Sequence, residues 1–199
     1  MKNLLASFIF FVSLSITGEA QHAEPQLLKG PVNWEFERFP LPPSFAPDIH
    51  YEGAEELRFA PGFSKKDSAT YFTYAFVAQL DNITAISQNE ISDYLLIYYK
   101  GLCGIVAKDR KLEIDTNKIS ASVERKTSTT ANETIYNASV NIFGVFADGA
   151  PVKLNMEIKV LINGAAKKTY LVFITSPHDK NDQVWKKLYE IQEEFTIPN

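Results

Sequence analysis

The chain has 199 residues and a formal net charge of −4, from 20 lysines and arginines against 24 aspartates and glutamates. Because this balance is acidic and no basic run occurs, it argues against nucleic acid or an anionic lipid surface as the principal partner. The length suffices for one hydrophobic core and is too short for two comfortable domains.

The first twenty residues carry the three parts of a secretory signal. Lys2 supplies a positive charge, residues 4–16 are apolar apart from three serines, and Gly18 and Ala20 are small residues before a cleavage site. The alternative is a membrane anchor, but residues 4–16 as a helix would span about 20 Å of a roughly 30 Å hydrocarbon core. We therefore expect residues 1–20 to be a signal peptide that is cleaved near Ala20. The mature protein is then secreted or periplasmic, and its sequence predicts no membrane span.

Cysteine usage bears on the compartment. Cys103 is the one cysteine of the chain, so no intrachain disulfide can form. Small secreted eukaryotic domains often need disulfides, and a bacterial periplasm or exterior is therefore favoured. Cys103 falls in a predicted helix, where we expect a buried, inert thiol. Three Asn-X-Ser/Thr triplets are interpreted as background; they begin at Asn82, Asn132 and Asn137.

The segment that follows the signal predicts an irregular start to one domain. Residues 21–33 are expected to be a flexible lead-in, and residues 34–199 a single domain. Residues 40–47 contain four prolines, which exclude a helix or a central strand and predict an extended arm. We interpret the arm as a cover for one edge of the core; the alternative is a docking segment for the groove of a partner. The covering side chains would be Phe39, Leu41 and Phe45.

A hairpin and a helix are predicted next. Residues 55–60 and 70–80 read as two strands, and the second is apolar on both faces, which is typical of a strand covered on both sides. After these strands, the apolar residues recur every three or four positions, as in a helix. Ser87 and Glu90 form a capping box at its start. The predicted buried face of this helix comprises Ile91, Leu95, Tyr98, Leu102 and Ile105.

In the second half of the chain, apolar and polar residues alternate, which predicts four antiparallel strands. They cover residues 119–124, 136–146, 152–162 and 168–175, with one apolar and one largely polar face. A final helix begins near Asn181 or Asp182. The fold class is therefore α+β: an antiparallel sheet, made of the hairpin and the four-stranded meander, packed by two helices on its apolar face. The apolar stripe of the final helix comprises Val184, Leu188, Ile191 and Phe195.

Candidate chemical groups are few, and the sequence assigns no catalytic, cofactor-binding or metal-binding residue. The histidines are His22 in the lead-in, His50, and His178 in a turn. A zinc site usually needs several His or Cys ligands, so we interpret the one acidic cluster as a solvated loop. No nucleophile elbow, phosphate-binding glycine loop, dinucleotide fingerprint or EF-hand loop occurs, and no cofactor is expected. The acidic cluster comprises Asp48, His50, Glu52, Glu55 and Glu56.

Aromatic side chains are concentrated in residues 34–76. We interpret them as core filling. The alternative is an open groove, in which ring faces would contact an apolar or carbohydrate-like ligand. The set comprises Trp34, Phe36, Phe39, Phe45, Tyr51, Phe59, Phe63, Tyr71, Phe72, Tyr74 and Phe76.

Three stretches carry a resemblance: residues 39–47, residues 55–62, and Tyr98-Tyr99-Lys100-Gly101-Leu102. Together they resemble a group of uncharacterised secreted bacterial proteins, over about half of the mature chain. This resemblance implies a Gram-negative origin and transfers no functional residues. The element order separately resembles the fold of PsbP and Mog1 proteins, which does not license a function.

These observations favour an exported, non-catalytic binding module for a protein or a small apolar or carbohydrate-like ligand. One alternative is a small secreted hydrolase that uses carboxylates or His50, with Asp48 or Glu52 converging on the histidine in a pocket. Another is a structural subunit of an envelope assembly, docked through the arm at residues 40–47.

Overall fold

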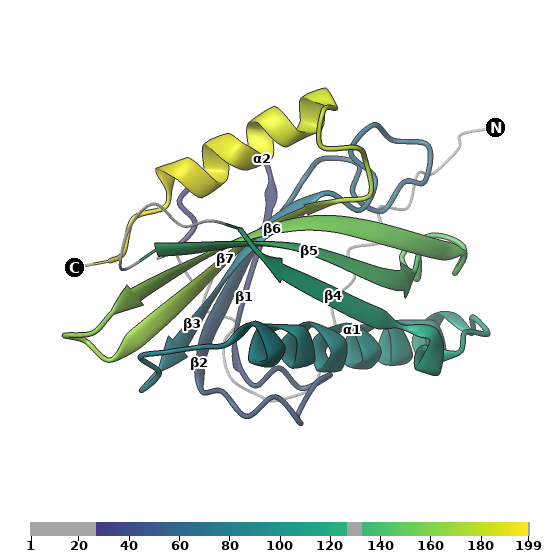
Figure 1. Ribbon diagram of the computed structural model, residues 1–199. Helices are drawn as coiled ribbons and strands as arrows, with labels where there is room; N and C mark the ends of the chain where they lie inside the picture. Colours follow the sequence, from purple (N-terminus) through teal and green to yellow (C-terminus); the bar gives the residue numbers. More distant parts are fainter. Residues whose placement is uncertain (1–26, 127–132, 199) are drawn as a thin grey trace, which may run out of the picture.

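Seven antiparallel strands form one sheet, in the order β1-β2-β3-β7-β6-β5-β4, between two helices (Figure 1). The structure is a computed structural model that describes residues 27–126 and 133–198. The predicted signal peptide, residues 21–26 with His22, and the triplet at Asn132 lie outside the described residues. The strands are β1 Glu35–Leu41, β2 Gly53–Phe59, β3 Tyr74–Asp81, β4 Ser120–Arg125, β5 Glu133–Phe143, β6 Pro151–Asn163 and β7 Lys168–Ser176; the helices are α1 Gln88–Arg110 and α2 Gln183–Glu194, with a short 3₁₀ turn at Thr116–Lys118.

The predicted α+β class is confirmed. The hairpin and the meander belong to the same sheet because β3 pairs with β7, with Phe76 opposite Phe173. A further strand, β1, precedes the hairpin and pairs with β2 at the sheet edge. Pro40 is accommodated there because an edge strand has no second neighbour that needs its missing N–H.

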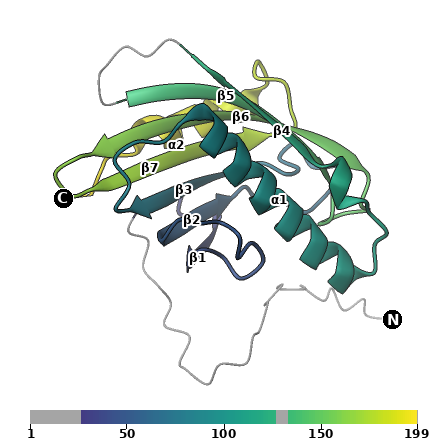
Figure 2. The same cartoon turned by 60° about the horizontal axis from the view of Figure 1, so that its bottom comes forward.

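The two helices lie on opposite faces of the sheet, which corrects the expectation that both cover one apolar face (Figures 1 and 2). The reason is that β3 and β7 are apolar on both sides. Phe76 and Phe173 face the α1 layer, whereas Val77 and Val172 face the α2 layer. A strand pair that is buried on both faces needs a second covering layer.

Helix α1 begins where the sequence predicts. Ser87 accepts a hydrogen bond from the Glu90 amide, and the Glu90 side chain accepts one from the Ser87 amide, so the capping box is present. Cys103 is fully buried in α1, and this burial raises the pKa of its thiol to about 11. The side chain is therefore an inert core residue.

The arm contacts the same helix. Phe45 packs edge-on against Tyr98, with ring centroids 5.0 Å apart, and Phe39 packs against Phe45. Leu41 is buried in the core. A Cβ atom added at Gly101 of α1 would lie 2.0 Å from the carbonyl oxygen of Phe45, so glycine permits this close approach.

The second layer is made by α2 together with residues 27–34, which we call the strap. Leu27, Leu28 and Trp34 are buried beside Trp185 and Leu188 of α2. The sequence predicts a flexible lead-in over residues 21–33, but Leu27 and Leu28 of this segment are buried against the sheet and α2. None of the helices within residues 27–126 and 133–198 combines the length and hydrophobicity needed to cross a bilayer.

Candidate functional site

Two adjacent acidic residues of β2, Glu55 and Glu56, have fully buried side chains. Successive residues of a strand point to opposite faces of the sheet, so one carboxyl enters each layer. Glu55 lies under α1, and Glu56 lies under the strap. Because a buried carboxyl needs hydrogen-bond partners, each of them fixes the position of the layer that supplies those partners.

Glu56 clamps the strap. Its Oε2 accepts hydrogen bonds from the backbone amides of Leu27 at 2.8 Å and Leu28 at 2.9 Å. Its Oε1 accepts a hydrogen bond from Arg38 Nη1 at 2.6 Å, and the two side chains form an ion pair. Arg38 and Glu56 are directly opposite each other in β1 and β2, so the strand register brings the pair together.

Arg58 completes the clamp two residues further along the same face. Its Nε and Nη2 donate to the carbonyl oxygen of Leu28 at 3.1 and 3.0 Å, and Nη1 donates to that of Trp34 at 3.4 Å. The guanidinium carbon lies 4.6 Å from the ring centre of Phe36. The carboxylate and the guanidinium thus hold the amide and carbonyl groups of the strap, and its leucine side chains remain available for packing.

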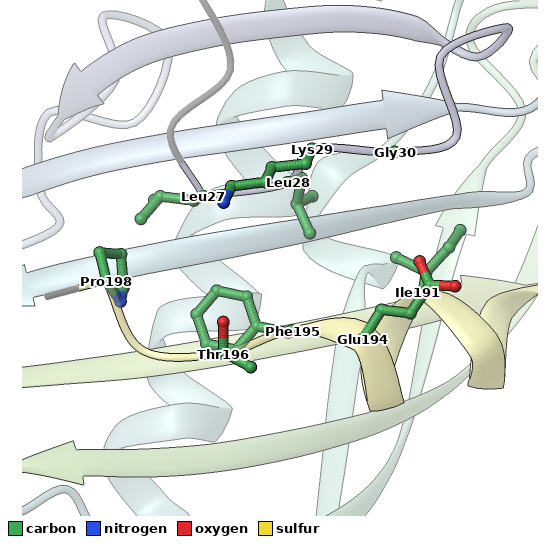
Figure 3. Close-up of a pocket in the computed structure, with 9 residues that line it drawn as sticks. All are labelled: Leu27, Leu28, Lys29, Gly30, Ile191, Glu194, Phe195, Thr196 and Pro198. Carbon is green, nitrogen blue, oxygen red and sulfur yellow. The ribbon is translucent and has the colours of Figure 1, made fainter.

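A groove of about 350 Å³ opens between the strap and the end of α2 (Figure 3). We call it the strap groove. Leu28, Ile191 and Phe195 are buried in its walls, and the Phe195 ring packs on Tyr170 at 5.8 Å. The lining comprises Leu27, Leu28, Lys29 and Gly30 of the strap and Ile191, Glu194, Phe195, Thr196 and Pro198 of the C-terminal segment.

Polar groups of the strap groove are exposed. Lys29 carries a positive charge, Glu194 a negative charge, and Thr196 a hydroxyl group. Pockets for small molecules generally combine apolar walls with a few polar groups and begin at about 300 Å³. The strap groove reaches this size and combines apolar side chains with a substantial polar surface, so it can hold the apolar part of a small amphipathic ligand beside its polar part.

The carboxyl on the other face, Glu55, is bound by tyrosines. Tyr94 donates to Oε2 and Tyr98 to Oε1, each at 2.8 Å. Burial raises the pKa of Glu55 from 4.5 to about 7, although the two hydroxyl donors act to lower it. The hydroxyl groups of Tyr74 and Tyr99 are hydrogen-bonded to each other nearby. Burial also raises the pKa of all four tyrosines, so their hydroxyls stay protonated near neutral pH.

The acidic cluster noted in the sequence does not form one site. Asp48, His50 and Glu52 are exposed, whereas Glu55 and Glu56 are buried on opposite faces. Among residues 27–126 and 133–198, no three His, Cys, Asp or Glu side chains come together in a way that could hold a metal ion.

His178 lies at the turn that precedes α2. Its Nδ1 is 3.6 Å from the carboxylate of Asp182, and its backbone carbonyl accepts hydrogen bonds from Asn155 and from the indole of Trp185. The residue therefore fixes the start of α2 against β6, in keeping with the turn role expected from the sequence.

Most of the aromatic residues singled out in residues 34–76 fill the core under α1, whereas Trp34 packs in the α2 layer and Phe36 lies against Arg58. Phe63 has ring centroids 4.8 Å from Phe59 and 5.1 Å from Phe72, and Phe76 stacks on Phe173 at 4.1 Å. None of the eleven aromatics singled out in the sequence lines the strap groove. The aromatic ring in its lining is that of Phe195, which directly follows α2 and belongs to the apolar stripe predicted for the final helix.

The sequence predicted Ile191 and Phe195 as part of the apolar stripe of the final helix, but it predicted neither the groove nor the strap that forms its other wall. The available signal was the pair Leu27-Leu28, together with two charged residues, Glu56 and Arg58, on one face of a predicted strand. Charged side chains in a buried strand require partners, and backbone groups of another segment can supply them.

Comparison with protein-family models, with curated proteins and with solved structures gave no match.

Proposed function

We propose that this protein is an exported binding module that holds the apolar part of a small amphipathic molecule in the strap groove. The observation that carries the proposal is the groove itself: a space of about 350 Å³ between two apolar walls, with Lys29, Glu194 and Thr196 exposed among its lining residues. Its volume suits a small molecule better than a folded partner, which would need a larger contact surface.

The clamp supports this role because it keeps one wall in place without a ligand. Glu56 and Arg58 bind the backbone on both sides of Leu28, so the strap does not have to be ordered by the incoming molecule. A preformed site avoids the entropy cost of ordering a loop upon binding.

Export is the second part of the proposal and is supported by the pattern of residues 1–20. It predicts that the native protein begins at Gln21. Intact-mass measurement on protein purified from its own cells tests this directly; material that begins at Met1 in the cytosol would contradict export.

The binding test fills the groove at a position that tolerates a side chain. Gly30 lines the groove, and a Cβ atom added there has no atom within 4 Å. Gly30→Phe should therefore occupy the groove and leave the fold intact. The matched control is Gly164→Phe, since Gly164 also has no atom within 4 Å of an added Cβ but lies in the turn between β6 and β7.

Binding is measured with the amphipathic fluorescent probe 1-anilinonaphthalene-8-sulfonate, and near-UV circular dichroism verifies that all three proteins are folded. We expect the wild type and Gly164→Phe to bind the probe equally and Gly30→Phe to bind it at least tenfold more weakly. Equal binding by all three proteins, or no binding by the wild type, would contradict the proposal.

A further inference from the structure

Helix α1 packs on the sheet through buried apolar side chains and is also hydrogen-bonded to it through the carboxyl group of Glu55. Each carboxyl oxygen accepts one hydrogen bond, from Tyr94 or from Tyr98, at 2.8 Å. These tyrosines are four residues apart, so both hydroxyls lie on the same face of the helix. Both rings also join the aromatic core, since Tyr94 stacks on Phe173 and Tyr98 on Phe76.

Among residues 27–126 and 133–198, the charged and titratable groups that act on this carboxyl include no cation. Helix α1 supplies Tyr94, Tyr98 and Tyr99, and β3 supplies Tyr74. Strand β1 supplies the carboxylate of Glu37, and the loop before β2 supplies Tyr51, which packs on Tyr94. An ionised Glu55 would therefore be a buried charge without a counter-ion, whereas a protonated Glu55 is a neutral group with two hydroxyl partners.

We propose that Glu55 is a proton-controlled latch for α1: its protonated carboxyl holds the helix against the sheet, and its ionised form loosens that contact. This device does not depend on ligand binding in the strap groove, which lies in the other layer. Opening of α1 lets water reach the carboxylate and removes the cost of burying its charge.

The latch acts over the pH range between the two pKa values of Glu55, from 4.5 to about 7. Burial raises the pKa of Glu55 from 4.5 to about 7 in the closed state. Since the closed state binds the proton more tightly than the open state, closure is most stable at low pH and weakens as the pH rises through 7. With a Glu55 pKa of 4.5 in the open state and about 7 in the closed state, the opening constant of α1 increases by roughly 70-fold between pH 5 and pH 8.

Native-state hydrogen exchange of the α1 amides at low urea concentrations tests the latch, after correction for the intrinsic pH dependence of exchange. We expect the opening constant of α1 to rise by about 70-fold from pH 5 to pH 8. At pH 8 it should depend only weakly on urea, which marks a local opening. An opening constant that does not change with pH would overturn the proposal. So would a urea dependence as steep as that of global unfolding.

Two variants identify the responsible group. Glu55→Gln cannot ionise and should make the α1 opening constant independent of pH over this range. Tyr98→Phe keeps the ring but removes a donor that lowers the Glu55 pKa, so the transition should move to higher pH. Tyr189→Phe on α2 is the matched control and should leave the transition unchanged. A Tyr98→Phe transition at the wild-type pH or below it would contradict the latch, even if Glu55→Gln fails to fold.

Discussion

On the α2 face of the sheet, Glu56 meets an arginine and two backbone amides, whereas on the α1 face its neighbour Glu55 meets two tyrosine hydroxyls. Both side chains are fully buried, and they are adjacent in the same strand. Burial alone therefore does not determine how a carboxyl group contributes to a fold. The donors around it do, because only a cation or several strong donors can replace the water that a carboxylate loses.

The comparison also separates two structural roles. The Glu56 clamp holds a short segment that lies outside the helices and strands, through the backbone amides of Leu27 and Leu28. The Glu55 contact joins two regular elements that already satisfy their own backbone. The first is needed for the strap to exist as a wall of the groove, and the second adjusts how firmly a complete helix is held.

The largest effect is expected from breaking the clamp. Glu56→Leu leaves the amides of Leu27 and Leu28 without their acceptor and Arg38 without its counter-ion, so the free energy of unfolding should fall by about 3–5 kcal/mol. Probe binding in the strap groove should be lost with it. Urea denaturation measures the stability. The control is Glu124→Leu, at an exposed position of the edge strand β4, which should change the stability by less than about 0.5 kcal/mol. A Glu56→Leu variant as stable as this control would show that the strap is not held by the carboxylate.

The second prediction concerns the other carboxyl. With a pKa of 4.5 in the unfolded chain and about 7 in the folded protein, Glu55 stabilises the fold most at low pH. Its contribution to the free energy of unfolding should decrease by about 2–3 kcal/mol between pH 5 and pH 8 and change little above that. The difference between wild type and Glu55→Gln, measured by urea denaturation at each pH, isolates this contribution. Parallel curves for the two proteins would contradict it.

A third prediction compares two glycines of α1. Gly101→Ala places a methyl group against the backbone of Phe45, so it should destabilise the protein by about 1–3 kcal/mol. A Cβ atom added at Gly104 would lie 3.9 Å from the Thr116 methyl group, so Gly104→Ala should stabilise the protein by up to about 1 kcal/mol through helix propensity. Thermal denaturation of both variants checks the opposite signs. Equal effects would mean that the arm does not pack on α1 as the structure has it.

The smallest effect is expected at an exposed residue between the arm and β2. His50 is exposed, so His50→Ala should change the free energy of unfolding by less than about 0.5 kcal/mol. The same variant, screened against general esterase and glycosidase substrates, tests whether the residue has a catalytic role. Loss of a wild-type hydrolytic activity in this variant would favour an enzyme over a binding module.

Periodicity predicted the regular part of this fold. The capping box at Ser87 follows from local rules of helix geometry, and the α+β class follows from the order of elements. The helix faces are predicted only in part. In α1, Leu102 and Ile105 are half-buried, and Cys103 and Val106 are buried in their place. In α2, Val184 is half-buried and Trp185 is buried. The opposite placement of the helices was not predicted, although β3 had been identified as apolar on both faces. Recognising that β7 shares this property would have required the β3–β7 pairing, which joins residues far apart in the sequence.

The candidate site was harder to predict. The lead-in contains the pair Leu27-Leu28 but no periodic spacing of apolar residues that would predict its packing. Glu55 and Glu56 were interpreted as part of a solvated acidic loop. Only the sheet register places Arg38 opposite Glu56, and only the docking of α1 brings two tyrosines to Glu55. Such partners are set by tertiary contacts and leave no local signature. The resemblance to PsbP and Mog1 folds stays a prediction.

Carbon-13 NMR of the Glu55 carboxyl group, titrated from pH 3 to pH 9 and assigned by its disappearance in Glu55→Gln, tests the contrast between the two faces most directly. We expect a midpoint near 7, because the carboxyl is buried among uncharged donors. A midpoint at the ordinary value of 4.5 would show that the α1 layer solvates this carboxylate, and the distinction between the two layers would be lost.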